Sequence, residues 1–155
     1  MLRPGAFSIP FAPLSLTLAG LIPFVGSAIA VATAGNDVIL KGQASFILLV
    51  YGAVILSFLG GVRWGIEMSR NEAPRFGVLV PSVAGALVGW AVVCLNLLNP
   101  GQSTQTLYLA LAGALILHWL WDLASRASTP NWYDGLRTIA TLGAVGSFLV
   151  ATVVV

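Results

Sequence analysis

The sequence predicts an all-α integral membrane protein, a bundle of five transmembrane helices. Its 155 residues are 58% hydrophobic and only 8% charged, whereas a soluble domain carries ~25% charged residues. Five apolar stretches each approach the ~20 residues that a helix needs to cross a bilayer. Six of the seven basic residues fall on one side of these stretches. We therefore expect one transmembrane domain that covers residues 1–155.

The five expected spans follow one another with short connections. Glycine in "AGND" (34–37) is typical of a helix end, and Asp37 is a candidate cap for the next helix. The later connections are "NPGQST" (99–104) and "STPNWYDG" (128–135), with Asp134 as a second candidate cap. The predicted spans cover residues 14–34, 44–69, 76–98, 104–124 and 136–154.

The distribution of basic residues predicts the orientation of the chain. Lys41 stands alone on one side, and the opposite side carries Arg3, Arg63, Arg70, Arg75, Arg126 and Arg137. Basic loops remain in the cytoplasm, so we expect the amino terminus inside and the carboxyl terminus outside. An aromatic belt is expected on the same inner side, formed by Trp64, Trp119, Trp121, Trp132 and Tyr133.

Small residues recur at intervals of four in three of the spans. In lipid, such stripes allow close approach of neighbouring helices and predict a tight bundle. On the second span, Arg63 lies about 200° around the helix from Gly61, so the charged face is expected to point away from the stripe. The predicted packing residues are Ala53, Ser57, Gly61, Gly65, Gly85, Gly89, Gly143 and Ser147.

Ionisable residues on the second and fourth spans form a candidate polar cluster. His118, Asp122 and Arg126 share one face at i,i+4 spacing, and Arg63 precedes Glu67 by one turn. Arg63 and Asp122 lie at similar depth, ~28 Å and ~27 Å along their helices. We expect Arg63 to pair with Asp122, with Glu67 and His118 alongside. The alternative is a set of separate interfacial side chains, each solvated.

Several kinds of chemistry find no support in the sequence. A net charge of +2 provides no basic patch for nucleic acid. No GxSxG, HExxH, P-loop or GxGxxG motif is present, so no catalytic residue is predicted. The single cysteine, Cys94, forms neither an internal disulfide nor a metal cluster, and one histidine excludes bis-histidine haem within the chain. We expect no cofactor and no metal.

Four stretches resemble a family of membrane proteins of unknown function that includes the mitochondrial transmembrane protein 69. They are "YGAVILSFLGGVRWG" (51–65), "PSVAGALVGW" (81–90), "LWDL" (120–123) and "PNWYDGLR" (130–137). The resemblance covers most of the chain and implies a five-helix protein of bacterial or mitochondrial inner membranes. It implies no activity, and no catalytic residues to carry over.

Two interpretations of function remain open, and catalysis is a weaker third. The first is a non-catalytic membrane component, either an assembly factor or a subunit of a larger complex or homo-oligomer. The second is a bundle that binds or transports a small molecule or ion through the polar cluster. The bilayer is the expected surrounding in both. Without an Arg-rich amphipathic leader, the chain is expected in a bacterial inner membrane rather than a mitochondrial one.

Overall fold

The predicted five-helix architecture is confirmed. The computed structural model describes residues 9–99, 101–125 and 129–155, and these residues form five helices. Each helix is long and apolar enough to cross a membrane. The helices are α1 (Phe11–Thr33), α2 (Val38–Arg70), α3 (Phe76–Leu98), α4 (Thr104–Ala124) and α5 (Asn131–Val154). The predicted positions of Arg3 and Arg126 lie outside the described residues.

Several helices are longer than the predicted spans. An apolar stretch identifies only the segment that lies in the hydrocarbon core of the bilayer, and the helix can continue beyond it. The third and fourth spans agree with α3 and α4, whereas α1, α2 and α5 begin earlier than predicted. Asp37 caps α2 as expected, since its Oδ1 accepts a 2.9 Å hydrogen bond from the Leu40 amide. The second predicted cap is wrong: α5 begins directly after Pro130, which places Asp134 inside the first turn.

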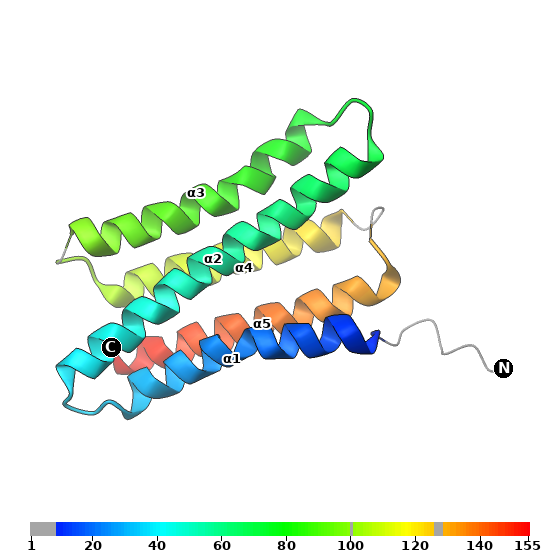
Figure 1. Cartoon of the computed structure of the whole chain (residues 1–155). Coiled ribbons are helices and arrows are strands. Elements are labelled where there is room, and N and C mark those ends of the chain that lie inside the picture. Colours follow the sequence, from blue (N-terminus) through cyan, green and yellow to red (C-terminus); the bar gives the residue numbers. More distant parts are fainter. Residues whose placement is uncertain (1–8, 100, 126–128) are drawn as a thin grey trace.

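The chain crosses the bundle five times in alternating directions (Figure 1). The beginning of α1, the α2–α3 connection and the beginning of α5 lie at one end. The carboxyl terminus, the α1–α2 turn and the α3–α4 connection lie at the other end. Gly35 has a φ of 55° in the α1–α2 turn, a left-handed conformation that glycine adopts without strain. The predicted glycine at the end of the first helix is therefore confirmed.

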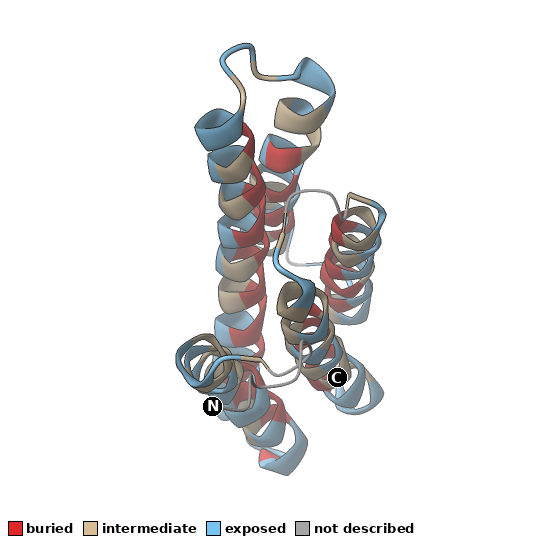
Figure 2. Ribbon diagram, turned by 90° about the vertical axis from the view of Figure 1, so that its right-hand side faces the viewer, coloured by how far each residue is buried: buried red, intermediate tan, exposed pale blue. Residues whose placement is uncertain are grey.

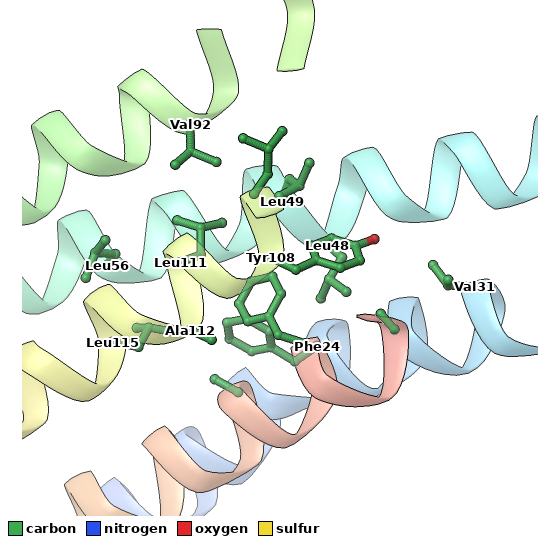
Figure 3. Close-up of a cluster of buried hydrophobic side chains, with 14 of the residues drawn as sticks. Phe24, Val31, Leu48, Leu49, Leu56, Val92, Tyr108, Leu111, Ala112 and Leu115 are labelled. Atoms are coloured by element: carbon green, nitrogen blue, oxygen red, sulfur yellow. The ribbon is translucent and has the colours of Figure 1, made fainter. Parts of the chain in front are cut away.

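The buried side chains form one continuous core between the helices (Figure 2). Tyr108 of α4 and Phe148 of α5 are fully buried, with ring centroids 5.5 Å apart. Phe24 of α1 lies edge-on to Phe148 at 5.8 Å. Figure 3 shows the core around Tyr108, with Leu48 and Leu111 from α2 and α4. Large apolar side chains cover the outer surface, as suits a bundle surrounded by lipid.

The close contact between α2 and α3 corrects the predicted packing stripe. A Cβ at Gly60 would overlap the Ser82 carbonyl oxygen, so only glycine permits this approach. On the α3 side, a Cβ at Gly89 would lie 2.9 Å from the Ala53 carbonyl oxygen, and one at Gly85 would lie 3.0 Å from that of Leu56. Ala53, Gly85 and Gly89 therefore lie at the α2–α3 contact.

The remaining predicted stripe residues of α2 lie on its exposed face. Ser57, Gly61 and Gly65 are exposed, and a Cβ at either glycine would meet no atom of the described residues within 4 Å. Strict i,i+4 spacing rotates by ~40° per step, so residues 53 to 65 turn through ~120° and leave the contact face. Arg63 lies on the buried face with Gly60, so it points away from Gly61 and Gly65 as predicted; the assignment of these two glycines to the packing surface within the bundle is wrong.

On α5, the predicted packing residues lie against α1. A Cβ at Gly143 would approach the Leu21 side chain to 2.7 Å. Ser147 is buried, and its hydroxyl donates a 2.9 Å hydrogen bond to the Gly143 carbonyl oxygen. This hydrogen bond satisfies the hydroxyl within its own helix, so α1 and α5 approach each other without an unpaired polar group at that position.

Candidate functional site

Four ionisable side chains from three helices meet inside the bundle. Arg63 belongs to α2, His118 and Asp122 to α4, and Arg137 to α5. Their exposed fractions are 4%, 6%, 3% and 3%, so none of them is a solvated interfacial side chain. We call these four residues the arginine cluster. The alternative of separate, solvated side chains is wrong for Arg63, His118 and Asp122.

Asp122 stands at the centre of the arginine cluster. Its Oδ2 accepts a 2.7 Å hydrogen bond from Arg137 Nε, the shortest polar contact in the cluster. Its Oδ1 lies 3.6 Å from Arg63 Nε, a distance typical of an ion pair without a hydrogen bond. One carboxylate thus faces two guanidinium groups, one from each neighbouring helix.

His118 lies one turn from Asp122 and also contacts Arg137. Its Nδ1 is 3.4 Å from Arg137 Nη2 and 3.6 Å from Asp122 Oδ2. A guanidinium nitrogen only donates, so the shorter contact fits a neutral imidazole whose Nδ1 accepts. The ring proton then belongs on Nε2, which is buried and has no partner among the described residues.

Arg63 is the least satisfied member of the cluster. Its Nε and Nη1 are buried and make no hydrogen bond to any described residue. Its guanidinium carbon lies 4.7 Å from the centre of the Trp121 ring, a cation–π arrangement that offsets part of the lost solvation. The aromatic ring supplies no acceptor oxygen, so the Nε and Nη1 donors of Arg63 remain without hydrogen bonds to the described residues.

Glu67 does not join the cluster, which corrects its predicted place there. Its carboxylate accepts hydrogen bonds from Arg75 Nε at 3.0 Å, Arg75 Nη2 at 2.9 Å and the Arg75 amide at 2.7 Å. These contacts close the connection between α2 and α3. The side-chain hydrogen bond to Glu67 also raises the pKa of Arg75 above its ordinary value. Arg75 is therefore the main partner of Glu67, and Arg63 adds only a weaker electrostatic interaction with the same carboxylate.

Arg137 is the residue that sequence reasoning missed, since it was interpreted only as an inner-side basic residue. The predicted start at residue 136 placed it in the first turn, whereas α5 begins at Asn131. The helical periodicity of the buried positions on α5 could have identified Arg137. Arg137 begins a helical series of buried positions that continues along α5 with Thr141, Ala144, Ser147, Phe148 and Ala151.

Two cavities flank the arginine cluster. The larger, about 420 Å³, lies between α1, α2 and α5, and both Arg137 and Thr141 line it. The smaller, about 210 Å³, lies between α2, α3 and α4, and both His118 and Trp121 line it. The cluster thus separates two cavities that are otherwise almost entirely apolar. Among the described residues, no three His, Cys, Asp or Glu side chains gather where they could hold a metal ion.

Residues 9–153 match the family described as "Protein of unknown function (DUF3429)". The chain belongs to this family. DUF3429 thus spans all five helices and every residue of the arginine cluster. The membership confirms the resemblance inferred from the sequence.

Two curated relatives of this DUF3429 protein are both named transmembrane protein 69. The chain is 38% identical to the one from Xenopus tropicalis over 143 residues, which is 90% of this chain and 53% of the relative. It is 32% identical to the one from Mus musculus over 147 residues, 93% of this chain and 56% of the relative. The chain therefore spans about half the length of these relatives. No solved structure matches it.

Proposed function

We propose that this multi-pass membrane protein is a non-catalytic component that binds a small anionic molecule at the arginine cluster. The observation that carries the proposal is an excess of buried positive charge. Arg63 and Arg137 share the single carboxylate of Asp122, and Glu67 is neutralised by Arg75. With a neutral His118, the cluster contains two positive charges, on Arg63 and Arg137, and one negative charge, on Asp122. One positive charge is therefore left without a counter-ion.

Such an excess is costly inside a membrane protein. Desolvation of an unpaired ion costs several kcal/mol, and intramembrane charges therefore pair or face a ligand. Arg63 retains two buried donors without acceptors, and Arg137 reaches a cavity of about 420 Å³. That volume is within the ~300–1,000 Å³ of small-molecule sites. A bound anion in that cavity, beside Arg137, supplies the missing negative charge.

A role in assembly is the second candidate, and one observation favours it. Ser57, Gly61 and Gly65 form a stripe on the exposed face of α2, where no described residue covers the glycines. Small residues at this spacing suit close approach of another transmembrane helix. Gly61→Leu and Gly65→Leu should abolish any self-association seen by cross-linking in native membranes, and unchanged cross-linking would exclude this face.

The proposal includes an orientation and a membrane. We propose that the protein spans the inner membrane of a bacterium. The end that carries Arg63, Arg75 and Arg137 then lies on the cytoplasmic side. The support is the asymmetry of basic residues, since Lys41 is the one basic residue predicted for the opposite side.

Native mass spectrometry of the protein in nanodiscs tests the binding function. The wild-type protein should carry a co-purified acidic molecule, and Arg137→Gln should lose it. Arg75→Gln is the matched control, because Arg75 serves Glu67 outside the cluster. If the wild-type protein and Arg137→Gln carry the same bound species, or if the species is neutral, the proposed function is wrong.

A further inference from the structure

The larger cavity has the shape of an elongated apolar groove. On α5 it extends from Trp132 to Ala144, twelve residues or roughly 18 Å at ~1.5 Å per residue. Phe24 of α1 and Leu115 of α4, both almost fully buried, form part of its floor. The groove thus runs lengthwise between helices, a form that suits an extended hydrocarbon chain.

Two buried polar side chains, Arg137 and Thr141, interrupt this apolar lining, and the half-buried Thr17 and Tyr133 also border it. Arg137 and Thr141 are one turn apart on α5, and both are 3% exposed. The Thr141 hydroxyl is buried without a hydrogen-bond partner among the described residues. A buried hydroxyl is ordinarily hydrogen-bonded, and leaving it unpaired is destabilising. Thr141 therefore adds an unused polar group on the face that presents the excess charge of the cluster.

The groove reaches the lipid-facing surface between α1 and α2. Leu16 of α1 and Phe58 of α2 line it and are 73% and 63% exposed, on the surface where lipid surrounds the helices. In Figure 1, α1 and α2 meet at the turn between them and diverge toward the opposite end. A molecule dissolved in the bilayer can enter between these two helices without passing through water.

We infer that the groove binds one single-chain amphiphile whose carboxylate faces Arg137 and Thr141. This inference rests on the proposed function and adds the class of ligand. A carboxylate accepts from both groups and balances the second guanidinium of the cluster. One narrow groove of about 420 Å³ suits one hydrocarbon chain rather than a lipid with two. Trp132 and Tyr133 lie at the α5 end of the groove, next to the membrane interface.

Quenching of tryptophan fluorescence by a brominated long-chain fatty acid tests this inference in nanodiscs of zwitterionic phospholipid. The fatty acid should quench more strongly than the same mole fraction of brominated phosphatidylcholine. The excess quenching should disappear in Trp132→Phe, because Trp132 lines the groove, and it should persist in Trp90→Phe, because Trp90 lies on the exposed surface of α3.

Three variants separate head-group recognition from folding. Thr141→Val keeps the side-chain shape and removes only an unpartnered hydroxyl, so it should fold normally and weaken binding about fivefold. Ala140→Phe should occlude the groove and abolish the excess quenching. Arg137→Gln should abolish it as well, provided that circular dichroism shows the variant to be folded.

Four outcomes would overturn the inference. Equal quenching by the brominated fatty acid and its methyl ester would exclude recognition of the carboxylate. Equal quenching by brominated phosphatidylglycerol would exclude a single-chain ligand, and unchanged binding by Thr141→Val would exclude the proposed head-group position. If mass spectrometry finds an Arg137-dependent polar anion without a hydrocarbon chain, this inference fails while the proposed function stands.

Discussion

Arg137 on α5 and Asp122 on α4, two residues that are each 3% exposed, form a 2.7 Å hydrogen bond between their side chains. Because Asp122 also lies 3.6 Å from Arg63, one carboxylate connects three helices. The contact is therefore both a structural joint of the bundle and the centre of the candidate site.

Replacement of the shared carboxylate should destabilise the bundle more than any change to an exposed acid. In Asp122→Asn, both arginines remain buried without a counter-ion, and the expected loss of unfolding free energy is about 3–5 kcal/mol. Glu72→Gln, an exposed substitution, is the control. Unfolding by titration of denaturing detergent measures both, and equal midpoints would show that Asp122 does not hold the helices together.

Two adjacent glycines of α2 provide a matched test of the α2–α3 contact. Gly60→Ala forces a methyl group against the Ser82 backbone and should cost about 1–3 kcal/mol through separation of the helices. Gly61→Ala meets no described atom within 4 Å and should leave stability unchanged or slightly raised. The same detergent titration compares the two, and a larger loss for Gly61→Ala would contradict the corrected packing face.

The Glu67–Arg75 pair should protect the amides of the α2–α3 connection from exchange. Arg75→Gln removes two side-chain hydrogen bonds and should accelerate hydrogen exchange at residues 71 and 75, with Arg70→Gln as the control. Because the pKa of Arg75 is raised in the folded protein, its charged form stabilises the fold at every pH below the ordinary pKa of arginine. This stabilisation is lost only when the pH rises above the raised pKa. Protection, corrected for intrinsic exchange rates, should therefore persist at mildly alkaline pH.

The aromatic core and the lipid-facing surface should respond differently to truncation. Phe148→Ala removes a fully buried ring that packs on Phe24 and Tyr108, and should cost roughly 2 kcal/mol or more through lost packing contacts. Its neighbour Leu149 is exposed on the outer surface, so Leu149→Ala should change stability little. Thermal unfolding in nanodiscs distinguishes them, and similar midpoints would contradict the described core.

Cysteine labelling can determine the orientation. In a Cys94→Ala background, Asn36→Cys should react with a membrane-impermeant maleimide in intact bacterial cells. Glu72→Cys, placed at the opposite end of the bundle, should react only after the membrane is permeabilised. The reverse pattern of labelling would invert the proposed topology.

Periodicity and hydropathy predicted the five helices because both are local properties of the chain. The same reasoning located Arg63 and Asp122 at similar depth on two helices, with His118 alongside. It misplaced Glu67 because its partner, Arg75, lies beyond the end of α2, where a loop decides the contact. It missed Arg137 because an apolar span starts later than the helix that contains it. Strict four-residue spacing also misdirected the packing stripe, since a helix repeats every 3.6 residues.

The two guanidinium groups beside a single carboxylate also determine how the site can be controlled. Arginine does not lose its proton under biological conditions, whereas histidine and carboxylates titrate closer to neutrality. A pH gradient across the membrane therefore cannot reverse the electrical sign of this region. The excess positive charge can be neutralised only by a bound anion, so the occupancy of the site sets the net charge at the junction of three helices.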